Sequence, residues 1–141
     1  EFGNVGDYPY RSVCTISTHD MSTLRGWWKE DYQQTQHFFN NVLGHYGAAP
    51  EKASGILCEE VVKQHLYSNS ILCILTLQDW LSMSEEWRNP NIEAERINVP
   101  ANPKHYWRYR MHVSLEDLMQ ADGINTKIRE LIVLTGRNPK K

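Results

Sequence analysis

The sequence is poor in cysteine and contains no long apolar run. Its three cysteines are odd in number and lack the Cys-x-x-Cys or Cys/His spacing of a zinc site. Cys14 and Cys73 lie inside apolar runs, where a thiol packs as a small hydrophobic group. No apolar run approaches the length of a membrane span. These absences favour a cytoplasmic protein and give no indication of a metal or a cofactor.

An excess of positive charge is also missing. The formal net charge is -2 and the isoelectric point is near 6.3, with the basic residues spread among acids except for the tail Lys140–Lys141. This pattern gives no indication of a nucleic-acid groove. The chain also lacks internal repeats and low-complexity stretches. Its 141 residues equal about one average domain.

Aromatic side chains, in contrast, are abundant. The chain has five Trp and seven Tyr residues. Flat aromatic faces are surfaces on which sugar rings stack, although most such side chains serve packing in a folded domain. The composition is therefore compatible with sugar binding but assigns it to no single ring.

Two segments of the sequence predict buried strands. Tyr10–Thr18 ends in a run rich in β-branched residues, and Ile71–Leu77 is a continuous apolar run typical of strands covered on both faces in parallel sheets. Between them we expect helices over 22–43, which Gly44 would end, and over 51–66. Because a strand, helices and a second strand form a βαβ crossover, the two strands are expected to be parallel.

The rest of the chain is less regular. Its prolines prevent any long helix between 84 and 112, and the aromatic content of this stretch predicts an ordered loop over one rim of the sheet. Ser114 begins a capping-box-like start of a short helix, and a last helix is expected over 125–135, ended by Gly136. The predicted fold class is therefore α/β and rich in helix.

The pair His19-Asp20 is the most informative feature, because it stands between the first predicted strand and a helix start at Ser22-Thr23. Gln78-Asp79 holds the same place after the second strand, so both pairs are expected at one rim. That is where β/α barrels carry their catalytic groups. The alternatives are structural: Asp20 as a helix cap or first-turn acid, and Gln78-Asp79 as rim anchors or caps of a short helix over 80–83.

Three segments together resemble one enzyme family. They are Thr18–Trp28, Leu77–Asp79 and Glu95–Arg110, in the family's order and spacing. They are similar to the C-terminal part of 4-α-glucanotransferases, the amylomaltases or disproportionating enzymes of glycoside hydrolase family 77. The plant cytosolic type and its bacterial relatives are the most similar. Ala101-Asn102 and His105-Tyr106 depart from other amylomaltases, which have Pro-Gly-Thr and Asn-Trp there.

The resemblance implies a fold larger than this chain, because a complete barrel needs about 250 residues. Residues 1–141 would form the C-terminal segment of a (β/α)8 barrel: its last two strands with their helices, and a C-terminal helical tail. The N-terminal part of the barrel and any starch-binding modules would be absent. Such a fragment leaves a strand edge uncovered, so we expect it to self-associate or to pair with the missing part.

The resemblance also implies an activity. The full-length enzyme would transfer glucosyl or glucanosyl units from maltose or maltooligosaccharides to a glycogen-like glucan acceptor, by a retaining double displacement. Asp20 matches the family carboxylate that bonds the 2- and 3-hydroxyls of the transferred sugar and stabilises the transition state. His19 matches the adjacent family histidine. The nucleophile Asp and the acid/base Glu lie on earlier strands of the family barrel, so this chain alone is expected to be inactive.

Gln78, Asp79 and Asn98 are further candidates for binding the substrate. Asn98 and the run Tyr106–Arg108 would either shape the pocket floor or clamp the long loop by stacking, and the clamp is favoured. We expect surface or packing roles for four histidines: His37, His45, His65 and His112.

Two functions of other classes remain as alternatives. A non-catalytic carbohydrate-binding module would usually be an all-β sandwich, which the long helical stretches disfavour. A helical interaction domain would leave His19-Asp20 and the proline-aromatic loop unexplained.

Overall fold

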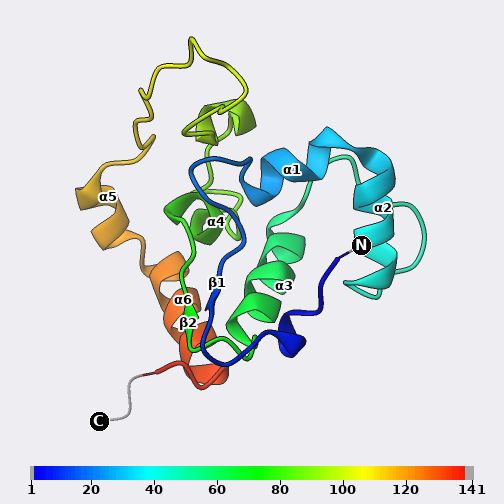
Figure 1. Cartoon of the computed structure of the whole chain (residues 1–141). Helices are drawn as coiled ribbons and strands as arrows, with labels where there is room; N and C mark the ends of the chain where they lie inside the picture. Colours follow the sequence, from blue (N-terminus) through cyan, green and yellow to red (C-terminus); the bar gives the residue numbers. More distant parts are fainter. Residues whose placement is uncertain (1, 139–141) are drawn as a thin grey trace.

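The computed structural model describes residues 2–138, so the Lys140–Lys141 tail lies outside the described part. The regular elements, in chain order, are η1 (Val5–Asp7), β1 (Val13–Cys14), α1 (Leu24–Glu30), α2 (Tyr32–Asn41), α3 (Gly55–Leu66), β2 (Leu72–Cys73), α4 (Leu77–Leu81), η2 (Ile92–Glu95), α5 (Leu115–Gln120) and α6 (Asp122–Leu134). Figure 1 shows α3 beside the two strands, with α6 near β2 and with α1 and α2 on the side of the N-terminus.

The two strands pair in parallel, as the crossover predicted. Val13 is in register with Leu72, and Cys14 with Cys73. Both strands are much shorter than the predicted runs, and the expectation that both faces are covered is wrong for this chain. The side chains of Val13, Leu72 and Ile74 are more than half exposed, because no other element of the described residues covers them.

The single helix predicted over 22–43 is two helices. Asp31 adopts an extended backbone between α1 and α2, and its carboxylate accepts hydrogen bonds from the backbone N–H groups of Gln33 and Gln34. Asp31 is thus an internal N-cap, and hydrophobic periodicity does not report such a break. Gly44 follows α2 with a positive φ of 74°, which confirms the predicted stop.

Later helices differ from the predictions mainly at their starts. α3 begins at Gly55 rather than near residue 51, because Ser54 is its N-cap. The short helix expected over 80–83 is α4, which begins after the N-cap Thr76 and so includes Gln78 and Asp79. Ser114 caps α5 as predicted, by accepting the backbone N–H of Asp117.

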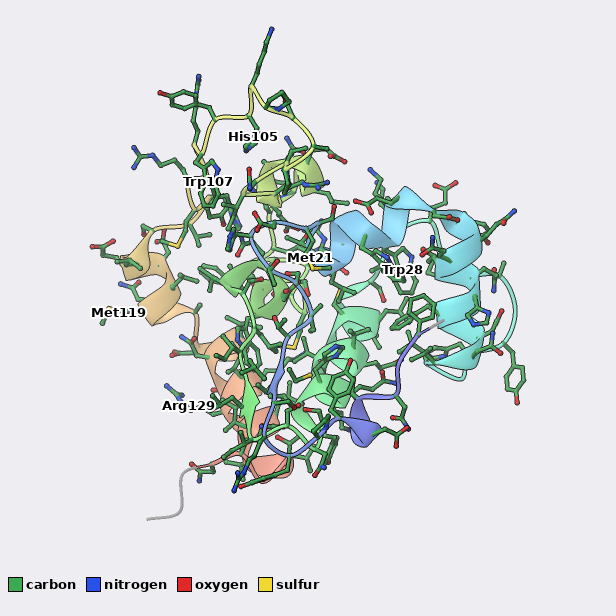
Figure 2. The ribbon with its side chains drawn as sticks, in the orientation of Figure 1. Met21, Trp28, His105, Trp107, Met119 and Arg129 are labelled. Carbon is green, nitrogen blue, oxygen red and sulfur yellow. The ribbon has the colours of Figure 1, made fainter. Side chains whose placement is uncertain are left out.

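The core forms around α3. This helix contacts α4 and α6 and buries five apolar side chains: Leu57, Cys58, Val61, Val62 and Leu66. Trp28 of α1 is almost completely buried and its indole N–H donates to the carbonyl of Pro50 at 2.8 Å. Figure 2 shows Trp28 between α1 and the neighbouring helices, whereas His105 and Trp107 stand on the long loop at the top of the view.

Arg137 ties the chain after α6 to the turn before β2. Its guanidinium donates to the carbonyl oxygens of Leu66 at 2.5 Å, Ser68 at 2.8 Å and Ser70 at 3.0 Å. The C-terminal helix is therefore held against the same turn that delivers the chain into β2. This fixes the start of β2 relative to α3.

Candidate sugar-binding site

The pair His19-Asp20 lies in a tight turn between β1 and α1. The turn is closed by the backbone N–H of Met21, which donates to the Thr18 carbonyl at 3.3 Å. Asp20 does not cap the helix, because the N-cap of α1 is Thr23. The capping alternative for Asp20 is therefore wrong. Its carboxylate instead lies 3.3 Å from His19 Nε2, with both side chains about half exposed.

Asn98, from the long loop, completes this cluster. Its side-chain amide donates to Asp20 Oδ1 at 2.7 Å, and its backbone N–H donates to the carbonyl of His19 at 3.0 Å. Since Asp20 Oδ1 is bonded to an amide, the orientation of the carboxylate is fixed. The structure thus brings together three of the five predicted site residues: His19, Asp20 and Asn98.

Arg96 holds the backbone of Asn98, a role that the sequence analysis missed. Its Nε donates to the Asn98 carbonyl at 3.0 Å, and one terminal nitrogen donates to Ser22 Oγ at 2.9 Å and lies 3.6 Å from Glu30. Arg96 therefore connects the loop that carries Asn98 to the start of α1. The sequence pointed to Arg96 only through its position in the segment Glu95–Arg110, which carries the family resemblance.

Asp79 is completely buried beneath the turn. Its Oδ2 accepts from Ser17 Oγ and, at 2.8 Å, from Thr76 Oγ1, while Oδ1 accepts the backbone N–H of Leu24 at 3.1 Å. One carboxylate thus joins the segment after β1, the start of α1 and the cap of α4. These bonds are those of an anchor, which was the alternative to a direct contact with substrate.

Gln78 is also buried, and its side-chain amide donates to the backbone carbonyl of Glu95 at 3.2 Å. This bond holds the end of η2, from which the chain continues to Asn98, against α4. Gln78 and Asp79 therefore lie below His19-Asp20, at the same end of the sheet, as the sequence predicted. They lie under the exposed cluster rather than within it.

A buried ion pair supports the same region. Arg25 donates to Glu95 Oε1 at 2.6 Å and to the Asn89 carbonyl at 2.8 Å, and Thr23 Oγ1 donates to Glu95 Oε2 at 3.0 Å. Burial raises the pKa of Glu95, which the charge of Arg25 and the Thr23 hydroxyl partly oppose. This pair was not predicted, because nothing in the spacing of Arg25 and Glu95 along the chain shows that they meet.

Aromatic rings lie beside the exposed cluster. The ring of Trp107 is 5.3 Å from that of His19 and is 60% exposed, so much of its surface is accessible next to His19. Arg108 stacks over the ring of Tyr106 at 5.0 Å, and His105 Nε2 lies 2.9 Å from the Ile97 carbonyl. The predicted stacking clamp therefore consists in part of the Arg108–Tyr106 contact, which joins two residues of the same loop segment. Trp107 is directed to the site instead.

The remaining histidines make the packing contacts expected of them. His37 stacks on Phe2, His45 stacks on Phe39 and pairs with Glu60, His65 bonds the Val61 carbonyl, and His112 bonds the Trp87 carbonyl.

Two of the cysteines are poorly suited to thiolate chemistry. Burial raises the pKa of the Cys58 thiol and raises that of Cys73 to about 11, so both thiols stay protonated near neutral pH. Within residues 2–138, no three His, Cys, Asp or Glu side chains gather in a way that could hold a metal ion. The same residues form no helix long and apolar enough to cross a membrane.

The exposed cluster therefore consists of a carboxylate, an imidazole and an amide beside an indole face. Such groups bind a neutral polyhydroxylated ligand, because the carboxylate accepts from hydroxyls while the ring packs against C–H surfaces.

Comparisons with known proteins agree with this chemistry. A family model described as 4-alpha-glucanotransferase (Glyco_hydro_77) matches residues 1–116. The rice protein named 4-alpha-glucanotransferase DPE2 is 39% identical over 138 residues, which are 98% of this chain and 15% of that protein. The 4-alpha-glucanotransferase of Chlamydia caviae is 31% identical over 132 residues, or 90% of this chain and 24% of that protein.

A solved structure shows the same fold. The amylomaltase from Streptococcus agalactiae, determined in complex with acarbose, superposes with a TM-score of 0.66 at 18% identity. The match covers 92% of this chain and 23% of that one. The chain thus spans less than a quarter of the length of each of these proteins.

Proposed function

Because this chain belongs to the 4-alpha-glucanotransferase family, we propose that it is the C-terminal segment of an enzyme that transfers glucosyl or glucanosyl units. The donor would be maltose or a maltooligosaccharide and the acceptor a glycogen-like glucan. The transfer would retain the configuration at the anomeric carbon through two displacements. The protein would then act in starch, glycogen or maltose metabolism.

The orientation of Asp20 by Asn98 is the observation that carries this proposal. The bond of 2.7 Å uses Oδ1 and leaves the half-exposed carboxylate able to accept from sugar hydroxyls. In glycosyl transfer the sugar gains positive charge at the transition state. A carboxylate bonded to its hydroxyls therefore stabilises the transition state more than the ground state. Asp20 would be that transition-state carboxylate.

The other site residues would divide into two groups. His19 would bond hydroxyls of the same sugar, and Asn98 would orient Asp20 and border the pocket. Gln78 and Asp79 would act on the sugar through the segments that they anchor, since both are buried under the turn. Trp107 would add a stacking face.

The nucleophile and the acid/base would come from earlier barrel strands, so the chain by itself would have no turnover. In this proposal β1 and β2 are the last two strands of a (β/α)8 barrel, and the N-terminal part of that barrel, with any starch-binding modules, lies outside residues 1–141. The exposed apolar side chains of Val13, Leu72 and Ile74 would contact the missing part. In the absence of the missing part, the chain would self-associate through the free edge of its sheet.

The proposed setting is the cytoplasm, with maltose, maltooligosaccharides and glycogen-like glucans as partners and with neither nucleic acid nor membrane involved. A non-catalytic carbohydrate-binding module of the usual all-β kind is disfavoured, because most of the regular elements in the described part of the chain are helices.

The test is glucosyl transfer from maltose to glycogen by the full-length enzyme, comparing wild type with Asp20→Asn. Loss of one transition-state carboxylate should lower the rate at least about a hundredfold. Both proteins must show the same melting temperature, so that the loss is one of catalysis. Near-normal transfer by a folded Asp20→Asn enzyme would remove Asp20 from the catalytic site.

A further inference from the structure

A cavity lies away from Asp20, against the segment that leads into β1. Its volume is about 910 Å³, and its walls are the entry segment 2–8, the end of α2 and one face of α3. Tyr8 on its wall precedes β1, whereas Asp20 follows that strand. We propose that this cavity is a second sugar-binding site, which holds a segment of the glucan while the reaction occurs at Asp20.

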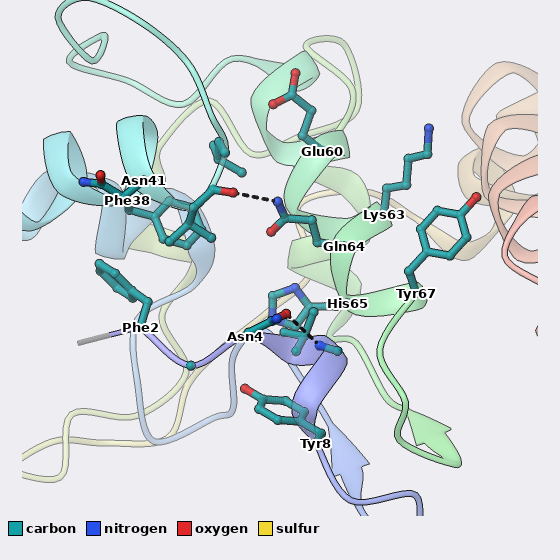
Figure 3. A pocket seen from close by; sticks show the side chains of 15 residues that line it. Phe2, Asn4, Tyr8, Phe38, Asn41, Glu60, Lys63, Gln64, His65 and Tyr67 are labelled. Carbon is teal, nitrogen blue, oxygen red and sulfur yellow. Dashed lines mark hydrogen bonds between the residues drawn. The ribbon is translucent and has the colours of Figure 1, made fainter.

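The size of the cavity suits a small ligand or one part of a chain, since ligand sites usually measure about 300–1,000 Å³. Figure 3 shows Phe2 and Phe38 on one side, with Gln64 and His65 of α3 on the other and Tyr8 nearby. Phe2 and Phe38 pack edge to face with ring centres 5.0 Å apart, so the apolar wall is fixed in position. Tyr8 adds a further ring with a hydroxyl group.

The opposite wall is polar because of helical spacing. Four lining residues at positions i, i+3, i+4 and i+7 share one face of α3: Glu60, Lys63, Gln64 and its C-cap Tyr67. Gln64 donates to the Val42 carbonyl at 3.2 Å, which uses one N–H and orients the amide. Among residues 2–138, neither the Gln64 carbonyl oxygen nor the Lys63 ammonium has a side-chain or backbone partner.

The charges in the cavity favour a neutral ligand. Glu60 lies 2.7 Å from His45 Nε2, so its carboxylate has a hydrogen-bond partner. The His65 ring lies 2.8 Å from the Val61 carbonyl through Nδ1, and burial lowers its pKa, which favours the uncharged ring. Lys63 is then the one cationic side chain among the described lining residues and lies near the acid Glu60, so the positive charge is insufficient for a phosphate site. An entirely apolar ligand would bury Lys63 and Gln64 without partners, at a cost in free energy.

A sugar meets both requirements, because its C–H faces pack on aromatic rings while its hydroxyls bond amide and ammonium groups. That the sugar is an α-1,4-glucan rests on the proposed function. A glucan chain held here and at Asp20 would bind through two sites on one molecule, which raises its overall affinity without changing the chemistry at Asp20.

The experiment separates glucan binding from transfer in the full-length enzyme. Migration in native gels containing glycogen measures binding without turnover, for wild type, Gln64→Ala and Tyr8→Ala. Tyr46→Ala is the matched control, since Tyr46 is 97% exposed and does not line the cavity. Gln64→Ala removes one hydrogen-bonding group and Tyr8→Ala removes one ring, so each should weaken glycogen binding by about fivefold. Tyr46→Ala should bind glycogen like the wild type. Transfer from maltose to glucose should stay at the wild-type rate.

Unchanged glycogen binding in both cavity variants would overturn the proposal, as would an equal loss in Tyr46→Ala. If Tyr8→Ala fails to fold, the exposed Lys63→Ala replaces it. Failure of the proposed function would appear differently, as a wild-type enzyme that binds glycogen but transfers nothing from maltose.

Discussion

The side-chain amide of Asn98 donates a hydrogen bond of 2.7 Å to Oδ1 of Asp20, although 78 positions separate the two residues. A second bond, from the Asn98 backbone to the His19 carbonyl, joins the same two segments. The long loop is thus attached to the turn after β1 at the place where the proposed transition-state carboxylate stands.

Asn98→Ala should lower the rate of transfer while leaving the fold intact. Removing the amide frees the Asp20 carboxylate to rotate away from the sugar, and a hydrogen bond to a charged group contributes about 1.5–3 kcal/mol. We therefore expect kcat for maltose transfer to fall about tenfold or more. The control is Asn102→Ala, on the same loop, since the Asn102 side chain accepts the backbone N–H of Lys104 and makes no other hydrogen bond within residues 2–138. Equal rates in Asn98→Ala and wild type would show that Asp20 does not need this orientation.

Arg25→Ala should strongly destabilise the protein. The guanidinium and the Glu95 carboxylate are 6% and 3% exposed, so the variant leaves a buried acid without its cation. Breaking such a pair costs about 3–5 kcal/mol. The exposed pair Lys29–Glu93, at 3.7 Å, is the control, and Lys29→Ala should cost less than about 1 kcal/mol. Urea unfolding followed by Trp fluorescence measures both changes, and similar costs for the two variants would contradict the expectation.

Gly55→Ala and Gly123→Ala should have opposite effects on the free energy of unfolding. A methyl group at Gly55 would lie 2.7 Å from the Met83 carbonyl oxygen, so α3 must shift, at a cost of about 1–3 kcal/mol. A methyl group at Gly123, within α6, meets nothing within 4 Å. Alanine there should stabilise by about 0.4–1 kcal/mol, since it restricts the unfolded chain. Thermal melting tests both, and a stabilised Gly55→Ala would show that the contact relaxes freely.

His65 should make stability depend on pH. Burial lowers its pKa below the ordinary 6.5, so the unfolded chain binds a proton at a higher pH than the folded chain does. The stabilisation is therefore present above pH 6.5 and is lost as the pH falls toward the lowered value. The free energy of unfolding, measured by urea between about pH 5 and 7.5, should fall less steeply with acid in His65→Gln than in wild type. Identical slopes would contradict the assignment.

The local pattern of the sequence predicted several features of the fold. The parallel pairing of the two strands followed from their apolar runs and the intervening helices, and the stop at Gly44 and the cap at Ser114 followed from residue type. The break at Asp31 was not predicted, because apolar positions continue at helical spacing on both sides of it. The strands were predicted too long, since apolar composition does not show whether a neighbouring strand is present to pair with.

The sequence by itself determined the family, the place of His19-Asp20 after a strand, and the candidacy of Asn98, because these depend on residue types in order along the chain. Only the tertiary structure decided which of these groups meet. Asn98 reaches Asp20 because Gln78 holds the backbone of Glu95 and Arg96 holds the backbone of Asn98, which fixes the segment 95–98 at both ends. Asp79 serves as an anchor because it bonds groups from three segments of the chain. Such contacts join residues far apart in sequence, and they depend on the packing of the whole chain rather than on any local pattern.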